Sequence, residues 1–179
     1  MLARNDALLI LVDVQGALAQ AMYDSETLFA NLRILIRGCQ VLGVPILWLE
    51  QNPAKLGPTI PDLTELLAGQ QPIAKMAFSC CGSGLFVEAL KSSGRSQVLL
   101  AGIEAHVCIY QTAVDLVAQG YHVEVVADAV SSRMAWNRDI GLARCHEAGA
   151  RLTSVEMALF EMLHTTEDPC FREILRLVR

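Results

Sequence analysis

Three residues that can act together in nucleophilic chemistry, Asp13, Lys75 and Cys108, lie far apart in the sequence but in similar local settings. Each stands at or shortly after the end of an apolar run: "LLILV" before Asp13, "PIA" before Lys75 and "VLLA" upstream of Cys108. A thiol is a nucleophile as its thiolate, an aspartate can accept and return a proton, and a lysine ammonium stabilises negative charge. Together, the three residue types suit attack on a carbonyl carbon through sulfur.

The reactivity expected of Cys108 depends on the surroundings of its sulfur. A free thiol has a pKa of about 8.5 and is mostly protonated at neutral pH. The pattern predicts a helix that begins near His106, which would place Cys108 in the first turn, where unpaired N–H groups and the helix dipole favour a thiolate. A nearby Lys75 ammonium would lower the thiol pKa further, and Asp13 would act as base and then as acid. The alternative is structural: a packed thiol, a turn-capping aspartate and a solvated lysine.

Apolar runs alternate with segments of helical periodicity along the chain. Several runs lack a polar face, which is typical of parallel strands covered by helices on both sides. Strands are predicted at 7–15, 44–51, 72–78, 97–102, 121–130 and the start of 150–163. Helices are predicted at 25–43, 62–69, 83–94, 105–120, 137–149, the rest of 150–163 and 168–178, and the proline-rich segment 52–61 is predicted to be a loop. This pattern predicts one α/β domain over residues 1–179.

In an open parallel sheet, ligands bind beyond the carboxyl ends of the strands. Asp13, Lys75 and the segment 102–108 each follow such an end. The predicted fold therefore brings the three candidate residues to one edge of the sheet.

Composition and charge exclude several classes of protein. The net charge is −5 with no cluster of lysine or arginine, which argues against nucleic-acid binding and polybasic membrane attachment. No apolar run reaches transmembrane length, and the N-terminal residues read as a first strand and not as a signal peptide. The six cysteines contain no C-x-x-C pair, so we expect reduced thiols and a cytoplasmic location.

The segments "LVDVQ", "PIAKMAFSC" and "LLAGIEAHVCIYQTAVDL", in this order and spacing, resemble the isochorismatase-like cysteine hydrolases. The segments "EQNPAKLGPTIP", "ADAVSSR" and "EMALFEML" are similar to the branch of isochorismatase domain-containing proteins. The resemblance implies a three-layer α/β/α fold around a six-stranded parallel sheet, with a catalytic triad of Asp13, Lys75 and Cys108. It also implies a cis peptide bond between Ile103 and Glu104, an oxyanion hole made by the backbone N–H groups of Glu104 and Cys108, and a homo-oligomer.

Other residues near the predicted edge are candidates for the substrate pocket. Three polar residues that follow the second strand are expected to contact a substrate: Glu50, Gln51 and Asn52. His106 either contacts the substrate or caps the helix. Trp48 and Phe78 either form an apolar wall or pack in the core.

The remaining cysteines and Asp128 are assigned structural roles. Cys39, Cys145 and Cys170 are expected to pack as small apolar residues. Cys80 and Cys81 follow Lys75 closely, so one of them can line the pocket, although packing is the simpler role. Asp128 ends another strand and is expected to cap a turn or a helix at the rim of the site.

No metal or cofactor is predicted. The nicotinamidases, which are metal-binding relatives, place an aspartate and two histidines after the second strand, whereas residues 48–75 of this chain contain no histidine. The four histidines are scattered without metal-ligand spacing. Isochorismatases that act on a vinyl ether lack the nucleophilic cysteine, which this chain keeps.

These observations favour hydrolysis of an amide-type C–N bond in a small molecule through a covalent acyl-enzyme on Cys108. The alternative is a non-catalytic small-molecule-binding or interaction protein on the same fold. A flavodoxin-like nucleotide-binding domain fits less well, because no G-x-G-x-x-G or P-loop motif follows a strand.

Overall fold

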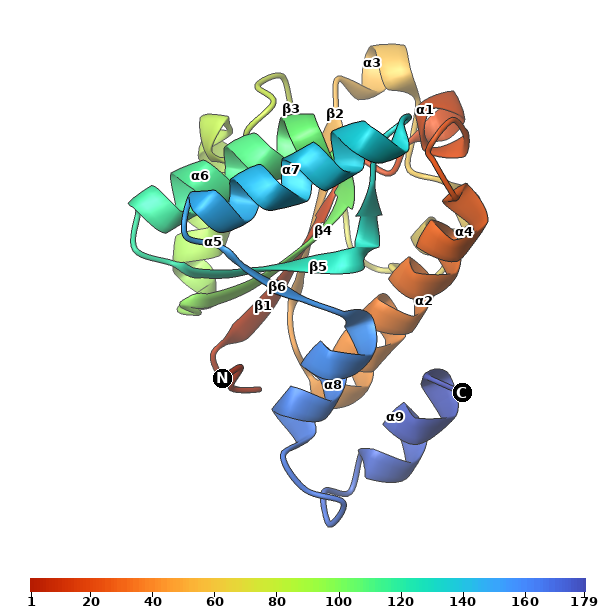
Figure 1. Ribbon diagram of the computed structural model, residues 1–179, viewed down its shortest axis with the longest axis vertical. Coiled ribbons are helices and arrows are strands. Elements are labelled where there is room, and N and C mark those ends of the chain that lie inside the picture. Colours follow the sequence, from red (N-terminus) through yellow and green to blue (C-terminus); the bar gives the residue numbers. More distant parts are fainter.

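A computed structural model describes all residues 1–179 and contains a six-stranded, all-parallel sheet. Its spatial order is β3-β2-β1-β4-β5-β6 (Figure 1). The strands are β1 (Ala7–Val12), β2 (Ile46–Gln51), β3 (Ile73–Lys75), β4 (Gln97–Ile103), β5 (His122–Ser131) and β6 (Arg151–Thr153). All six predicted strands are present. The central pair, β1 and β4, is fully buried over nearly its whole length, as expected for strands without a polar face.

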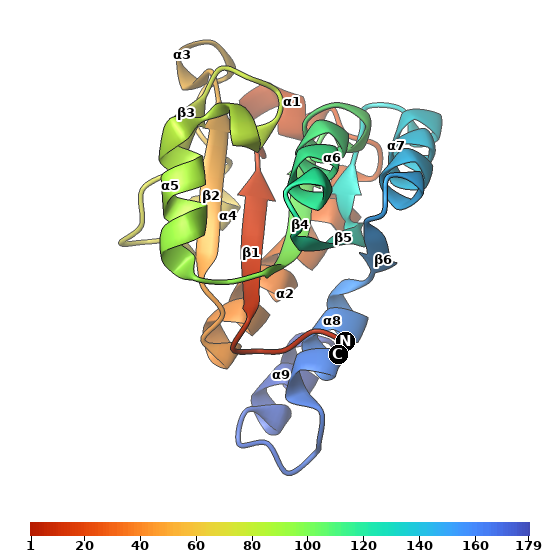
Figure 2. The same cartoon turned by 90° about the vertical axis from the view of Figure 1, so that its left-hand side faces the viewer.

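Helices cover both faces of the sheet, which confirms the predicted three-layer α/β/α class. One face carries α2 (Ser25–Leu42), α4 (Pro61–Thr64), α8 (Val155–Leu163) and α9 (Phe171–Leu177). The other face carries α5 (Gly84–Ser93), α6 (Tyr110–Ala118) and α7 (Ala135–Glu147), which lie in front of the sheet in Figure 2. Each face encloses its own apolar cluster, so the sheet is the central layer between two cores.

All strands point the same way, and their carboxyl ends lie beside two short helices at one end of the molecule (Figure 2). These helices are α1 (Gly16–Gln20), which follows β1, and α3 (Pro53–Leu56), which follows β2. Helix α1 is not among the predicted elements, and α3 lies within the segment 52–61 that is predicted to be a loop. Both helices are only about one turn long, too short for an apolar periodicity to be visible in the sequence.

Two further short elements lie at this end of the sheet. A 3₁₀ turn, η1 (Cys80–Gly82), follows β3, and a wide π-helical turn, η2 (Ala105–Ile109), joins β4 to α6. The predicted helix start near His106 is therefore correct in position but not in geometry. Such π-helical turns are rare and often occur at functional sites.

Gly102 allows β1 and β4 to approach closely just before the carboxyl edge. Its φ is +117°, and a Cβ at this position would lie 2.1 Å from the carbonyl oxygen of Val12. The residues that follow on each strand, Asp13 and Ile103, are thereby held side by side. A side chain at position 102 would push the two strand ends apart.

We therefore expect Gly102→Ala to destabilise the fold by about 3 kcal/mol or more, through backbone strain and overpacking. The measurement is urea unfolding of the variant beside Gly84→Ala. Gly84 lies in a helix without a positive φ, and a Cβ added there would meet no atom within 4 Å, so its replacement is expected to be neutral or slightly stabilising. Equal stability of the two variants would show that the strands can separate at Gly102 without cost.

Candidate functional site

Asp13 is the first residue after β1 and adopts a left-handed conformation, with φ at +56°. Non-glycine residues rarely adopt positive φ, and such residues gather at functional sites. The side chain is buried, and its Oδ2 accepts a hydrogen bond of 2.7 Å from Lys75 Nζ. The second oxygen, Oδ1, is buried without any hydrogen-bond partner. One carboxylate oxygen is therefore fixed by a cation while the other is available to accept a proton.

Lys75 ends β3, and its side chain has no exposed surface. Besides Asp13 Oδ2, its ammonium donates to Gln51 Oε1 at 2.7 Å and lies 3.0 and 3.2 Å from the carbonyl oxygens of Phe78 and Ala77. A buried ammonium needs such a set of acceptors to offset its lost hydration. Lys75 is thus an internal cation of the site, not a solvated surface charge.

Cys108 lies in η2, where it is 7% exposed and lines the same cavity as Asp13. The Glu104 carbonyl accepts hydrogen bonds from the N–H groups of Val107 and Ile109, the residues on either side of Cys108. The N–H of Glu104 donates no hydrogen bond within the chain. The peptide bond between Ile103 and Glu104 is cis, at the position that the resemblance implies.

The electrostatics of the site differ from the sequence-based expectation. Burial raises the pKa of the Cys108 thiol, the Asp13 carboxylate raises it further, and Lys75 offsets only part of this rise. Burial likewise raises the pKa of Asp13 above its usual range, against the opposing effect of Lys75 and a smaller one of the Cys108 thiol. The expected lowering of the thiol pKa is therefore wrong. The sulfur carries its proton at neutral pH, beside a carboxylate that is a stronger base than an exposed aspartate.

Burial also raises the pKa of thiols elsewhere, to about 12 for Cys39 and Cys80 and about 11 for Cys145. In the unfolded chain these thiols ionise at their ordinary pKa, while in the folded chain they stay protonated. Their contribution to stability is therefore fully present below about pH 9 and is lost as the pH rises from there toward the folded pKa values.

We expect the free energy of unfolding to fall above pH 9 by about 1.4 kcal/mol per pH unit for each fully buried thiol. The measurement is urea unfolding between pH 8 and 10.5, with Cys39→Ala as the comparison. That variant loses packing at every pH, so its free energy of unfolding is lower throughout. Above pH 9, however, that free energy should fall less steeply than in the wild type, by about 1.4 kcal/mol per pH unit, because one buried thiol is missing. Parallel curves for the two proteins would contradict the assignment.

A second ion pair fixes the turn that carries Glu104. The carboxylate of Glu104 accepts hydrogen bonds from the backbone N–H and the Nε of Arg133, at 3.0 and 3.2 Å. A register shift between β4 and β5 places Ser131 opposite Ile103, which brings the following residues beside the turn. On the other side, α7 packs closely, because a Cβ on Gly141 would lie 2.6–2.7 Å from backbone atoms of Ala105 and His106.

The cavity above Cys108 has a volume of about 110 Å³. It is lined by Asp13, Leu18, Gln51, Leu56, Phe78, Ile103, Glu104, Val107 and Cys108. Of the residues proposed for the pocket, Gln51 and Phe78 line it. Three further lining residues are not among the predicted ones: Leu18 on α1, Leu56 on α3 and Val107. The available signal was their position in short segments that follow strand ends, where the loops of a parallel sheet gather.

Three proposed pocket residues do not line the cavity. Glu50 alternates with Gln51 along β2 and points to the opposite face, where its carboxylate accepts hydrogen bonds from the N–H and hydroxyl of Thr59. Asn52 uses its backbone N–H to bind the carbonyl of Lys75. His106 neither reaches the cavity nor caps the helix, since its Nδ1 lies 2.9 Å from the hydroxyl of the buried Ser132.

Several other predicted roles can be compared with the structure. Trp48 packs in the core and donates a hydrogen bond to Thr59, so it forms no wall of the cavity. Cys80 is buried beneath the site, Cys81 is half-buried, and neither lines the cavity. Asp128 does cap a helix, since its Oδ1 accepts from the N–H of Val155, but that helix is α8 on the face packed by α2, and Asp128 is not at the rim.

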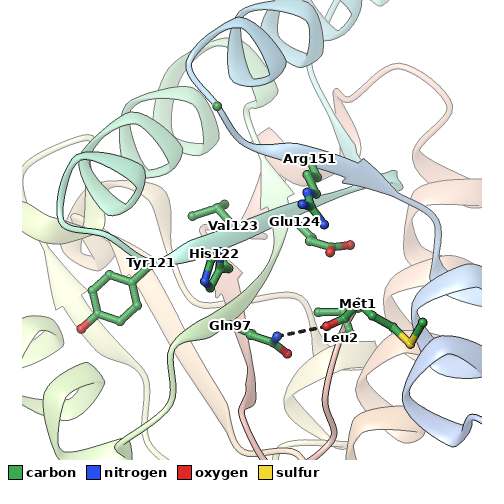
Figure 3. A pocket seen from close by; sticks show the side chains of 9 residues that line it. Met1, Leu2, Gln97, Tyr121, His122, Val123, Glu124 and Arg151 are labelled. Atoms are coloured by element: carbon green, nitrogen blue, oxygen red, sulfur yellow. Dashed lines mark hydrogen bonds between the residues drawn. The ribbon is translucent and has the colours of Figure 1, made fainter.

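Another cavity, of about 240 Å³, lies near the amino ends of β4, β5 and β6 (Figure 3). Gln97, His122, Glu124 and Arg151 line it together with Met1 and Leu2. It contains no cysteine, and it lies at the strand ends opposite to Asp13 and Cys108. We therefore assign the chemistry to the smaller cavity, which contains both of these residues.

Nowhere does the structure gather three or more histidine, cysteine, aspartate or glutamate side chains in an arrangement that could hold a metal ion. None of its helices combines the length and apolar character needed to cross a membrane.

Comparison with known proteins agrees with this architecture. The chain is 35% identical to isochorismatase domain-containing protein 2 of Danio rerio over 182 residues, which cover 99% of this chain and 89% of that protein. Its fold matches the MAR1 ribonuclease of Caenorhabditis elegans with a TM-score of 0.92 and 35% identity, covering 99% and 91% of the two chains. YcaC of Pseudomonas aeruginosa, solved with hexane-2,5-diol and covalent acrylamide, matches with a TM-score of 0.92 and 25% identity, covering 98% and 90%.

The family described as the isochorismatase domain matches residues 7–157, which include every strand and the whole candidate site. This match and the relatives above confirm the resemblance found in the sequence. The chain belongs to the isochorismatase family.

Proposed function

We propose that this protein is a cysteine hydrolase that cleaves an amide-type C–N bond of a small molecule, with Cys108 as nucleophile, Asp13 as general acid and base, and Lys75 as the cation that fixes Asp13. The observation that carries the proposal is the unpartnered Oδ1 of Asp13 beside a protonated thiol in one cavity, with the other carboxylate oxygen bound to a buried ammonium. A merely structural aspartate would have its buried oxygens satisfied.

In the first step, Asp13 Oδ1 takes the Cys108 proton as the sulfur attacks the carbonyl carbon. The charge then moves from the carboxylate to the substrate oxygen, where the N–H groups of Glu104 and Cys108 can receive it. Each such donor contributes roughly 3 kcal/mol to stabilisation of the transition state. The C–N bond breaks as Asp13 returns the proton to the leaving nitrogen, which leaves an acyl group on sulfur and an ionised Asp13.

In the second step, Asp13 takes a proton from a water molecule as the water oxygen attacks the carbonyl carbon of the thioester. The C–S bond then breaks, and the sulfur regains its proton from Asp13. The products are a carboxylic acid and an amine or ammonia. Lys75 keeps Asp13 in position throughout, since its contacts with Gln51 and the 77–78 backbone do not depend on the protonation state of the carboxylate.

Two relatives bear on reactivity and on the choice of substrate. The Pseudomonas YcaC structure contains covalent acrylamide, a small amide. The Caenorhabditis relative is named a ribonuclease. We do not extend RNA cleavage to this chain, because its net charge is −5 and no lysine or arginine lines the cavity to bind a phosphate backbone.

The test is a screen of small amides, ureides and esters for ammonia or acid release by the wild-type protein and by Asp13→Asn. The amide side chain keeps the volume of Asp13 but cannot accept the thiol proton through a carboxylate. Turnover by the wild type with loss of at least about 10³-fold in the variant is expected. Equal turnover by both would remove Asp13 from the reaction, and the absence of any turnover would favour a non-catalytic binding protein.

We further propose a homo-oligomer in a reducing, cytoplasmic compartment. Met134, Trp136 and Ile140 expose their apolar side chains at the start of α7, beside the turn that carries Cys108. All six cysteines are free. Light scattering on the purified protein tests the assembly, and a charged residue at Trp136 should dissociate it if this surface is buried between copies.

A further inference from the structure

The walls of the cavity above Cys108 are apolar on the side away from Asp13. Leu18, Leu56, Phe78 and Val107 surround the sulfur, and each comes from a different segment: α1, α3, the β3–η1 connection and η2. The volume of about 110 Å³ is well below the roughly 300–1,000 Å³ of sites that hold drug-sized ligands. The cavity thus fits a short aliphatic group more closely than a ring with polar substituents.

No positive charge in or beneath the cavity is free to bind an anionic ligand. The Lys75 ammonium already faces four acceptors: Asp13, Gln51 and the carbonyls of Ala77 and Phe78. Arg133, which does not line the cavity, is bound to Glu104. The two charged residues that line the cavity, Asp13 and Glu104, are both acidic. A carboxylate on the substrate would therefore lose its hydration in the cavity without meeting a free cation.

A cationic group is also disfavoured. The unpartnered Oδ1 of Asp13 would bind an ammonium, and a carboxylate engaged in this way could not accept the thiol proton. The remaining polar group, the Gln51 side chain, is already used at both ends, by Lys75 and by the carbonyl of Met76.

From these observations, which extend the function proposed above, we infer that the substrate is an uncharged amide with a short apolar acyl chain, and that the cavity, with Phe78 at its mouth, excludes anionic substrates. Phe78 is 54% exposed, so it forms the entrance and can be replaced without removing core volume.

The test uses two pairs of compounds that differ only in charge. Iodoacetamide and iodoacetate alkylate Cys108 directly, without any need for turnover, and the labelled peptide is quantified by mass spectrometry. Each rate is divided by the rate measured for the same cysteine in the urea-unfolded chain. Succinamide and succinamate, which have the same shape, are compared as substrates by ammonia release, with butyramide as the apolar member of the series.

We expect a normalised preference of about 100-fold for iodoacetamide over iodoacetate, because the anionic reagent loses its hydration in an apolar cavity that offers no free cation. The order of turnover should be butyramide, succinamide, then succinamate. Phe78→Arg places a cation at the entrance. It should reduce the preference for iodoacetamide over iodoacetate, and that for succinamide over succinamate, at least about tenfold. Met157→Arg, an exposed apolar residue of α8 that does not line the cavity, is the matched control and should change neither.

Equal normalised alkylation by the two reagents would overturn the inference. Preference for succinamate over succinamide would contradict it as well. The two proposals can fail separately. Selective alkylation by iodoacetamide without hydrolysis of any amide would refute the proposed hydrolase activity but would support the preference for uncharged ligands. Leu56→Arg provides a second cationic variant from a different segment, should Phe78→Arg not fold.

Discussion

The variant Cys108→Ala is expected to lose amide hydrolysis by about 10⁵-fold or more and to keep its fold. Without the nucleophile the covalent intermediate cannot form, so the whole reaction path is lost and not just one interaction that stabilises the transition state. The change from thiol to methyl in a well-packed site removes little volume, so stability should change by no more than about 1.5 kcal/mol. The measurement is ammonia release from an accepted amide, together with a urea unfolding curve.

The matched control is Cys145→Ala. Cys145 is fully buried on the same face of the sheet, and burial alone raises the pKa of its thiol. This variant should lose a similar amount of packing and keep its activity. Retained turnover in Cys108→Ala, or equal loss in both variants, would place the chemistry elsewhere.

The variant Lys75→Met is expected to be destabilised by about 3–5 kcal/mol at neutral pH and to be inactive. The substitution leaves the Asp13 carboxylate buried without a cation, which is far more costly than loss of an exposed pair. The double variant Asp13→Asn/Lys75→Met removes both charges and should regain most of the stability but none of the activity.

The pH dependence of Lys75→Met provides a second check of this pair. Burial already raises the pKa of Asp13 with Lys75 present, and loss of the ammonium removes the main opposing effect. A carboxyl with a raised pKa contributes stability that is fully present below its unfolded pKa and is lost as the pH rises through its folded pKa. The single variant should therefore gain stability relative to the double variant as the pH falls from 7 toward 5. A constant difference would show that Asp13 is not an uncompensated charge in Lys75→Met.

The positions of Asp13, Lys75 and Cys108 could be predicted because parallel strands place their carboxyl ends at one edge. Apolar runs without a polar face identified the sheet, and each of the three residues follows such a run. The same alternation along a strand distinguishes Gln51, which reaches the site, from Glu50, which points to the opposite face. The sequence alone does not reveal which of two consecutive residues at a strand end points into a cavity.

The residues that line the cavity and the protonation state of the Cys108 thiol could not be predicted from the sequence, for physical reasons. Leu18 and Leu56 lie on helices of about one turn, whose positions depend on tertiary contacts and not on a repeating pattern. The pKa of Cys108 is set by burial and by the distances to Asp13 and Lys75, which act in opposite directions. A resemblance to thiol hydrolases indicates which groups meet, but the balance between them requires the three-dimensional arrangement.

The claim on which this account depends is that Cys108 forms a covalent acyl intermediate. Wild-type protein is mixed with excess of an amide that it hydrolyses, quenched in acid within the turnover time, and digested for mass spectrometry. The account predicts that the peptide containing Cys108 gains the mass of the acyl group, that hydroxylamine removes it, and that the other five cysteines stay unmodified. Turnover without any acyl group on Cys108, or with the acyl group on another residue, would contradict it.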